Sequence, residues 1–257
     1  CIQSWHWILY SCTSRCCRRY SKVNWIKNEI LDYWRSKMKI GSEVNKPIVF
    51  GKVKTVYQGI EDEEVLIHYH DKVTAGNGAK EENFKGKGKL TAEISSLIFK
   101  ELEKAGINTH FIQSAGPGMM RCKKVAIIPI EVVVRNIADG SIVRQTTISK
   151  DTVFNPPLIE FYLKDDSKND PLLTEDRLSL MGYKNLSLIK QYAKEVNTIV
   201  CDLFNKIGIV LVDFKLEFGS TVEGKIVVAD EISPDGCRLR NLNNESMDKD
   251  LFRKNEG

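Results

Sequence analysis

Long apolar runs are missing from this sequence, and cysteine is scarce over most of it. No stretch approaches the roughly 20 apolar residues that a membrane-spanning helix needs, which argues against a membrane partner. Internal repeats and low-complexity tracts are also absent, so the 257 residues can form one large core or two smaller ones. After residue 37 the cysteines are Cys122, Cys201 and Cys237. Their wide separation is typical of reduced thiols and predicts a cytoplasmic protein.

The body of the chain also lacks an excess of positive charge. The formal net charge is +4, but residues 1–37 alone carry +5 and the remaining 220 residues carry −1. A basic surface that tracks phosphates is therefore not expected in the body, and we predict no nucleic-acid partner. An RNA-binding module driven by the basic N-terminal segment is an alternative, and deletion of residues 1–37 would test it.

Residues 1–37 differ from the rest of the chain in composition. They contain all four tryptophans and four of the seven cysteines, and the first methionine is Met38. We interpret them as an extension that arises from the chosen reading frame, with natural translation starting at or near Met38. The apolar stretch Trp5 to Tyr10 is too short for a signal peptide and precedes the arginine cluster. The local cysteines lack the paired C-x-x-C spacing of a zinc site.

Hydrophobic periodicity in the body predicts an α+β protein of two lobes, an N-terminal lobe over 38–126 and a C-terminal lobe over 127–257. The first lobe is β-rich and the second mixes helices and strands. Ile127–Ile130 is expected to cross between the lobes because Pro129 cannot donate to a central ladder. Strands are predicted over 47–57, 64–70, 110–113, 123–134 and 211–219, and helices over 90–105 and 186–207.

The most informative segment is 211–231, where charged and apolar residues alternate. On a strand Asp213, Lys215 and Glu217 share one face. If the chain reverses at Glu223-Gly224, Glu217 lies directly opposite Asp230. Like charges at such a position destabilise a sheet unless a cation lies between them. Few, oxygen-only ligands suit Mg²⁺ that carries substrate phosphates, so the hairpin predicts a nucleotide site.

Two lysines beside a glycine form a weaker candidate for phosphate binding. Lys52 and Lys54 are expected to share a strand face next to Gly51, where a nucleotide could approach. The spacing is not that of a Walker A loop. Taken alone, a solvated strand face is the favoured interpretation of these two lysines.

Further candidates follow a buried strand and a tight turn. Arg135 ends the strand and Ser141 lies in the turn after it; the arginine could hold phosphate bidentately or form a structural ion pair. The turn Ser233–Gly236 is expected to aim Asp235 and Arg238 toward the carboxylate pair. Cys237 is interpreted as a packing residue, because no histidine lies nearby in sequence to activate it.

Together these segments resemble the SAICAR synthetase family in its short bacterial form, over about Ile48 to Lys254. The resemblance rests on ordered motifs: Gly51–Tyr57, Thr74–Gly78, Gly86–Gly88, Gly106–His110, Ile128–Arg135, Gly140-Ser141, Leu211–Gly219, and Asp230–Asp235 with Arg238. It implies that ATP, the aminoimidazole ribonucleotide CAIR and L-aspartate give SAICAR, ADP and phosphate through an acyl phosphate. It also implies ATP in a cleft between two α+β lobes, the first similar to the small lobe of kinases.

The resemblance assigns roles to individual residues. Lys52, Val53 and Lys54 would bind ATP, and Ile127 and Ile130 would border the adenine. Glu217 and Asp230 would bind Mg²⁺. The CAIR phosphate and ring would be held by Arg135, Ser141 and Arg238, with Lys215, Asp213 and Asp235 as catalytic neighbours.

The sequence departs from the family pattern in four places. Residues 1–37 have no counterpart, and the chain stops at Gly257 where relatives continue through a terminal helix. Asp139 stands where a small residue usually precedes Gly-Ser, and Arg240 where tryptophan is common. We expect altered packing behind the substrate loop. A kinase-like phosphotransferase is the alternative function, although H-R-D and D-F-G motifs are absent. Homo-oligomer formation stays open.

Overall fold

The computed structural model describes residues 46–75 and 80–248, and these divide into two compact units. Among the described residues, the first unit comprises 46–75, 80–97 and 111–124, and the second comprises 98–110 and 125–248. The predicted extension over 1–37 lies outside the described residues. The sequence suggested one passage between lobes, near residue 127, whereas the chain passes between the units three times.

The first unit is built on a five-stranded antiparallel sheet. In spatial order its strands are β1 (Pro47–Phe50), β2 (Lys54–Gln58), β3 (Glu64–Tyr69), β7 (Met119–Lys123) and β6 (Phe111–Gly116). Strands β4 (Lys72–Ala75) and β5 (Lys80–Asn83) form a separate antiparallel pair. Along β3, Val65, Ile67 and Tyr69 are buried and alternate with less buried residues, as expected of a strand with one face on a core.

Two predicted strands need correction. The expected strand over 47–57 is a hairpin of β1 and β2, because the chain turns at Gly51, whose N–H bonds the Lys54 carbonyl at 2.8 Å. The expected strand over 123–134 joins the end of β7 to most of β8 (Ala126–Ile137), with a break between them. Apolar content cannot reveal such a break, because both flanking strands are apolar.

Helix α3 (Lys87–Lys104) agrees with the helix predicted over 90–105. Its apolar side chains are buried at helical spacing, among them Ile94, Ile98 and Leu102. The helix ends at Lys104, and Gly106 follows it with a left-handed φ of +85° that suits glycine. The N–H of Ile107 then bonds the carbonyl of Leu102 at 3.0 Å, which closes the last turn.

The second unit is built on a six-stranded antiparallel sheet. Strands β10 (Leu172–Leu173), β9 (Val153–Leu163), β8 and β11 (Ile209–Ser220) follow one another, and the far edge of β11 pairs with both β13 (Cys237–Asn241) and β12 (Ile226–Ala229). Short helices α4 (Ser141–Gln145) and α5 (Glu175–Leu180) and the 3-10 turns η3 (Asp166–Lys168) and η4 (Pro234–Gly236) lie in the connections.

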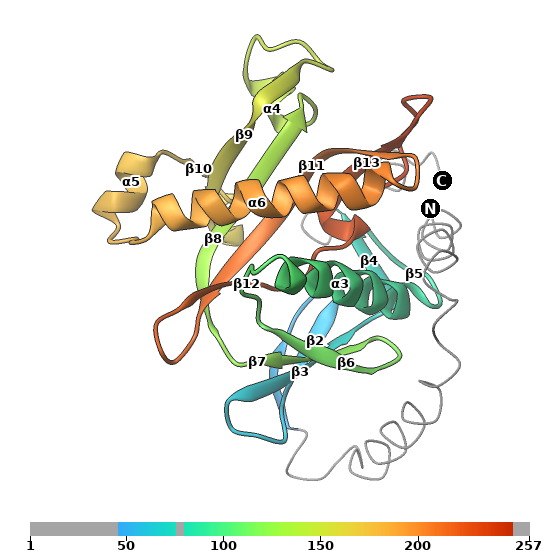
Figure 1. Ribbon diagram of the computed structural model, residues 1–257, viewed down its shortest axis with the longest axis vertical. Coiled ribbons are helices and arrows are strands. Elements are labelled where there is room, and N and C mark those ends of the chain that lie inside the picture. Colours follow the sequence, from blue (N-terminus) through green and yellow to red (C-terminus); the bar gives the residue numbers. More distant parts are fainter. Residues whose placement is uncertain (1–45, 76–79, 249–257) are drawn as a thin grey trace. The chain divides into compact units, whose positions relative to one another are not determined.

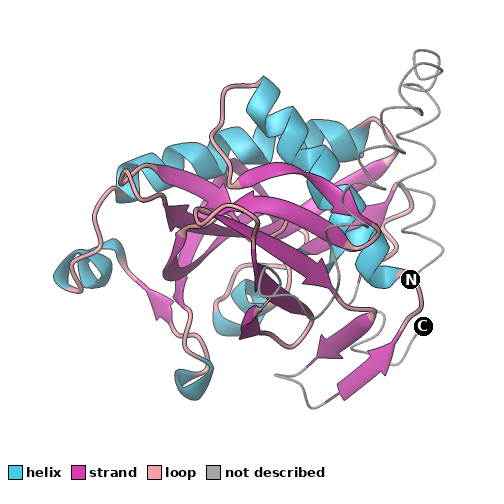
Figure 2. Ribbon diagram, turned by 90° about the horizontal axis from the view of Figure 1, so that it is seen from below, coloured by secondary structure: helices cyan, strands magenta, loops and turns pink. Residues whose placement is uncertain are grey.

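The long helix α6 (Leu186–Asn205) contacts β11, β8 and β9 (Figures 1 and 2). Its predicted apolar stripe is confirmed, since Ile189, Ala193, Val196, Val200 and Phe204 are buried. The opposite face of the sheet is thereby left to the polar side chains of β8 and β11. No helix among the residues that the structure describes has the length and apolar character needed to cross a membrane.

Pro129 lies within β8 instead of at a crossing, which corrects the interpretation of Ile127–Ile130. The pairing of β8 with β11 runs from Glu217↔Glu131 to Gly219↔Ile127, so the segment around Pro129 is a bulge. A bulge tolerates proline because the local ladder is already interrupted. Ile130 is fully buried, whereas Ile127 is 42 % exposed. The side chain of Ile130 therefore cannot touch a ligand without opening the core.

The predicted register of the hairpin is wrong by one residue. Glu217 pairs with Ala229, not with Asp230. The loop has three residues, 222–224, instead of a two-residue reversal; Gly224 adopts φ +78°, and the Thr221 N–H bonds the Lys225 carbonyl. A type I turn followed by a left-handed residue produces this longer loop. Asp230 consequently follows the end of β12, in a left-handed conformation with φ +64°.

Candidate active site

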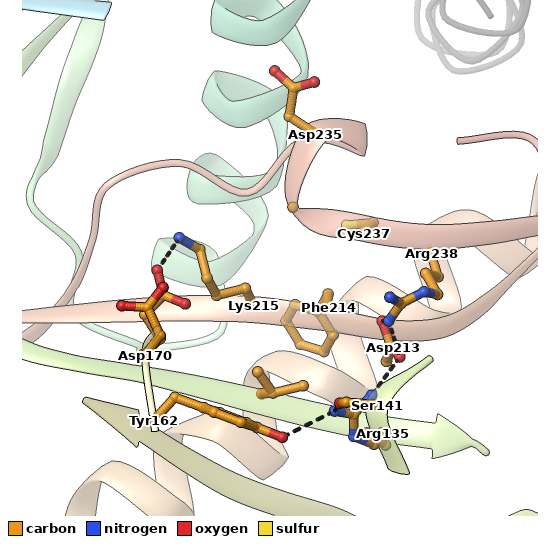
Figure 3. Close-up of a pocket in the computed structure, with 13 residues that line it drawn as sticks. Arg135, Ser141, Tyr162, Asp170, Asp213, Phe214, Lys215, Asp235, Cys237 and Arg238 are labelled. Atoms are coloured by element: carbon orange, nitrogen blue, oxygen red, sulfur yellow. Dashed lines mark hydrogen bonds and ion pairs between the residues drawn. The ribbon is translucent and has the colours of Figure 1, made fainter. Parts of the chain in front are cut away.

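A cavity of about 340 Å³ opens on the polar face of the second unit's sheet (Figure 3). It brings together six residues that the sequence singled out: Arg135, Ser141, Asp213, Lys215, Asp235 and Arg238. The other lining residues are Glu131, Val133, Tyr162, Asp170, Phe214, Gly236 and Cys237. These side chains come from strands and turns that are distant in sequence.

Strand alternation and register place these charges on one face. Asp213 pairs with Arg135, and Glu217 pairs with Glu131, so the odd-numbered positions of β11 and β8 are side by side. The shared face of Asp213, Lys215 and Glu217 expected from alternation is therefore present. Side chains from β9 and β13 contact the charged residues of this face.

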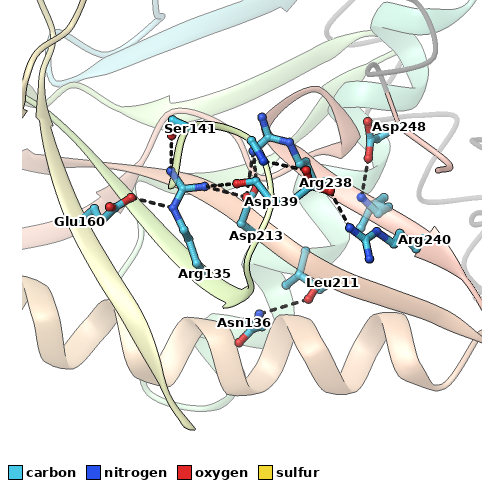
Figure 4. A network of polar contacts seen from close by, with 12 residues as sticks. Arg135, Asn136, Asp139, Ser141, Glu160, Leu211, Asp213, Arg238, Arg240 and Asp248 are labelled. Carbon is cyan, nitrogen blue, oxygen red and sulfur yellow. Dashed lines mark hydrogen bonds and ion pairs between the residues drawn. The ribbon is translucent and has the colours of Figure 1, made fainter. Parts of the chain in front are cut away.

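At one end of this face, Asp213 accepts hydrogen bonds from two arginines (Figure 4). Its Oδ2 lies 2.9 Å from Nη1 of Arg135 and 2.8 Å from Nη1 of Arg238. Burial pushes the pKa of Asp213 upward, and the charges of Arg238 and Arg135 oppose that effect. We call this group the arginine end of the site.

Arg135 has a protein acceptor for each of its five N–H groups. Nε binds Glu160 at 2.6 Å, Nη1 binds Asp213 and the Asp139 carbonyl, and Nη2 binds the hydroxyls of Ser141 and Tyr162. Although burial works against its charge, Glu160 and Asp213 raise the pKa of Arg135. Of the two alternatives left open by the sequence, this geometry favours the structural ion pair. Arg238, whose side chain is 22 % exposed, is the better candidate to meet an anion.

At the other end, Glu217 is held by two lysines. Nζ of Lys215 lies 3.0 Å from Oε1 of Glu217 and 2.6 Å from Oε1 of Glu131. Nζ of Lys164 binds the second oxygen, Oε2. The Glu217 side chain is only 2 % exposed, whereas that of Lys164 is 44 % exposed. We call this group the lysine end.

The ammonium group of Lys215 lies among carboxylates. Although burial favours its neutral form, the charges of Glu217, Glu131 and Asp230 raise its pKa. A general base needs a pKa near the working pH, so a raised pKa disfavours that role for Lys215. The charge of Asp230 is among those that raise the pKa of Lys215, although Asp230 does not lie opposite Glu217.

The carboxylates of the lysine end are oxygen donors of the kind that Mg²⁺ prefers. Within 46–75 and 80–248, no three His, Cys, Asp or Glu side chains converge as metal ligands. A pair such as Glu217 and Asp230 would therefore supply part of a shell. Mg²⁺ characteristically uses one or two carboxylates together with waters and substrate phosphates. The carboxylates already attract cationic groups, which fits that donor set.

The two remaining candidates of the second unit, Asp235 and Cys237, differ in how they lie relative to the cavity. Asp235 lies in η4, and its carboxylate points away from the ion pairs of β11, contrary to the expected aim of the turn (Figure 3). Cys237 lines the cavity, but burial and the surrounding carboxylates raise its thiol pKa well above the ordinary value. This supports its interpretation as a packing residue.

The lysines of the first unit do not share a strand face. Lys52 is exposed in the turn between β1 and β2, whereas Lys54 begins β2. Nζ of Lys54 lies 5.8 Å from the centre of the Tyr69 ring. The Val53 carbonyl accepts a hydrogen bond from the N–H of His70. The part of Thr74–Gly78 after Ala75 lies outside the described residues.

Sequence reasoning missed several residues of the site. Glu160 and Tyr162 alternate on β9 and contact Arg135, and Glu131 lies four residues before Arg135 on the same face of β8. The spacing of Glu160 and Tyr162, two residues apart on β9, could have indicated from the sequence that both face the site. Lys164 follows the end of β9, and no local pattern distinguishes it from an ordinary surface lysine.

Comparisons with known proteins identify the family of this chain. The family model described as SAICAR synthetase matches residues 47–257. Phosphoribosylaminoimidazole-succinocarboxamide synthase of Oceanobacillus iheyensis is 47 % identical over 212 residues, which cover 80 % of this chain and 90 % of that protein. The Staphylococcus aureus protein of the same name is 44 % identical over 211 residues, with the same coverage.

Solved structures give the same result. A SAICAR synthetase in complex with ADP superposes with a TM-score of 0.78 at 40 % identity, covering 81 % of this chain and 91 % of that one. The synthase of Ehrlichia chaffeensis superposes with a TM-score of 0.78 at 41 % identity, covering 82 % and 92 %. The two-lobe α+β fold class predicted from the sequence is confirmed by these neighbours. The chain belongs to the SAICAR synthetase family.

Proposed function

We propose that this chain condenses CAIR with L-aspartate at the expense of ATP, giving SAICAR, ADP and phosphate in purine biosynthesis. The observation that carries the proposal is the cavity of a SAICAR synthetase fold with arginine- and lysine-bound carboxylates along one strand. Both nucleotide substrates are anionic, so their binding requires cations at defined places. Because its substrates are nucleotide metabolites and its described cysteines are free thiols, we expect a cytoplasmic enzyme.

The reaction divides a difficult amide formation into two displacements. A carboxylate oxygen of CAIR attacks the γ-phosphorus of ATP, the bond to ADP breaks, and an acyl phosphate forms. The aspartate amine then attacks the acyl carbon, phosphate leaves, and the nitrogen loses a proton as the amide forms. Phosphoryl transfer of this kind depends on positioning and charge neutralisation more than on a protein nucleophile.

The proposed roles follow the two ends of the site. At the arginine end, Arg238 and Ser141 hold the CAIR phosphate and ring, with Arg135 and Asp213 as their support. At the lysine end, Glu217 and Asp230 would hold Mg²⁺, which would neutralise phosphate charge. Lys215 remains cationic beside Glu217 and stabilises transferred negative charge.

Fewer observations support the roles proposed for the ATP-binding residues and for Asp235. Lys52, Lys54 and the Val53 backbone are proposed to bind ATP phosphates, and Ile127 to border the adenine. For the buried Ile130 only a backbone contact is compatible with its burial. Asp235 is proposed to act near the substrates, through a change of rotamer from the one seen here.

A coupled assay of ADP release tests the function. ADP should appear with ATP, Mg²⁺, CAIR and aspartate, together with an equal amount of SAICAR. Sustained ADP release that ignores aspartate, with another phosphorylated product, would favour the kinase-like phosphotransferase. Deleting residues 1–37 should leave catalysis unchanged, and loss of RNA binding in that variant would instead support the RNA-binding alternative.

A further inference from the structure

A second ion-pair group lies directly behind the cavity wall and involves Arg240 of β13. Its guanidinium binds Asp139 at 2.5 Å through Nη2 (Figure 4). Through Nη1 it binds Asp151 at 2.6 Å and Asn244 at 2.8 Å. The Arg240 side chain is only 9 % exposed. A guanidinium so far from water needs carboxylate partners, and removing one leaves an uncompensated charge.

Arg240 holds both stems of one loop. The loop leaves β8 after Ile137 and enters β9 at Val153, with α4 between. Asp139 is near its start and Asp151 near its end, and the Asp151 N–H bonds the Ala138 carbonyl at 3.0 Å. One side chain on β13 therefore closes the base of the loop that carries Ser141.

The partner Asp139 is continuous with the cavity wall. Its Oδ1 accepts the Gly140 N–H at 2.7 Å, and its carbonyl accepts Nη1 of Arg135 at 3.3 Å. Gly140 has φ +68°, and a Cβ there would lie 2.7 Å from the guanidinium of Arg238. The turn thus lies flat against Arg238 and presents Ser141 to Arg135.

The electrostatic balance also depends on Arg240. Burial alone would raise the pKa of Asp139, but hydrogen bonds from Arg240 and the Gly140 N–H lower it, so the carboxylate is charged. Its negative charge acts on Asp213 as well. Without Arg240, an unneutralised carboxylate would stand beside the place proposed for the CAIR phosphate.

We propose that Arg240 and Asp139 form a positioning pair that sets the Gly140-Ser141 turn and its charge for binding the ribonucleotide substrate. The proposal rests on the proposed function of the cavity. The structure joins the side chains of Arg240 and Asp139 directly. A matched pair explains why a buried arginine and an acidic turn residue occur together in this chain.

The test is a double-mutant comparison in the full chain. Arg240→Met should raise KM for CAIR about tenfold and leave KM for ATP within about twofold. The reason is that the substitution removes the support only of the turn proposed to bind CAIR. Asp139→Ala should raise KM for CAIR less, about threefold, since it leaves no anion behind. The double variant should bind CAIR better than Arg240→Met alone, and Arg240→Lys should recover part of the loss.

The matched control is Lys225→Met, which removes an ion pair of similar length from the exposed hairpin loop. It should change neither KM. Equal rises in both KM values for Arg240→Met, additive losses in the double variant, or an unchanged KM for CAIR would each overturn the proposal. Thermal unfolding of every variant separates a folding defect from a binding defect.

Failure of the proposed function has a different signature. The unaltered chain would then release no SAICAR in the presence of all substrates. Calorimetric titration of CAIR into the unaltered and Arg240→Met chains tests the positioning pair in that case. A tenfold weaker affinity supports it and equal affinities overturn it.

Discussion

Asp213 and Glu217 lie on the same face of β11, and both are nearly buried, yet they are neutralised by different cations. Asp213 is bound by two arginines that project from β8 and β13. Glu217 is bound by Lys215 of its own strand and by Lys164, which follows β9. The two ends of this face thus differ in the type and the exposure of their cationic partners.

The difference indicates which end can exchange its partner. Arg135 uses its planar guanidinium to hold five acceptors at once, so its removal or motion would break several bonds. Lys164 is a point charge on a flexible stem and is 44 % exposed, and Lys215 continues to neutralise Glu217 when Lys164 withdraws. We infer a static arginine end that receives an anion, and a lysine end where Mg²⁺ can replace an ammonium group.

The largest effect is expected from neutralising the lysine end. Glu217→Gln keeps the shape of the side chain but removes the charge proposed to bind Mg²⁺. A bound metal supplies several kcal/mol of charge stabilisation, so kcat should fall by roughly a thousandfold. Steady-state kinetics over a Mg²⁺ series measures this, with circular dichroism to verify the fold.

Glu223→Gln is the matched control, because Glu223 is exposed in the adjacent hairpin loop and pairs only locally with Lys225. Its kcat should equal that of the unaltered chain. Near-normal Mg²⁺-dependent turnover in Glu217→Gln would remove the metal assignment and the contrast between the two ends.

The second largest effect should appear as stability at the arginine end. Asp213→Asn leaves Arg135 and Arg238 without their shared carboxylate in a buried place. Breaking a buried ion pair on one side costs about 3–5 kcal/mol of unfolding free energy. Urea denaturation followed by far-UV circular dichroism measures it. A loss below about 1 kcal/mol would show that this end is no more tightly built than a surface pair.

A smaller effect is expected from Lys164→Gln. Removing an ammonium group that competes for Glu217 should tighten Mg²⁺ binding a few-fold, while unfolding free energy changes by less than about 1 kcal/mol. Titration calorimetry with MgCl₂ on the nucleotide-free protein measures the affinity for Mg²⁺ without relying on turnover. Lys168→Gln is the control from the same loop, since Lys168 pairs with Asp165 and not with Glu217. Weaker Mg²⁺ binding in Lys164→Gln would contradict the exchange.

The smallest effect concerns pH. Because neighbouring carboxylates raise the pKa of Lys215, its folded-state value lies above its unfolded-state value. Its contribution to stability is then complete below about pH 10.4 and is lost only as pH rises through the higher folded-state value. Between pH 7 and 9, kcat should therefore show no inflection from this group. A basic inflection in that range that disappears in Lys215→Arg would identify Lys215 as a titrating base.

Local patterns predicted much of the fold but little of the pairing. The apolar stripe of α6 and the stop at Gly106 depend on residues within a few turns of one another, and both were predictable. The register of the hairpin depends on whether its loop has two or three residues. The sequence Val222–Gly224 is compatible with either length, and the structure has three loop residues. That single residue decided whether Asp230 would lie opposite Glu217.

For this chain, strand periodicity alone was enough to establish that Asp213, Lys215 and Glu217 share one face, because alternation is a property of the backbone. Which cations meet that face was decided by tertiary structure. Arg135, Arg238 and Lys164 come from strands and loops that are distant from β11 in sequence, and long-range packing has no local signal. The same reason hid the contact between Asp139 and Arg240, separated by 101 residues and joined only by the fold.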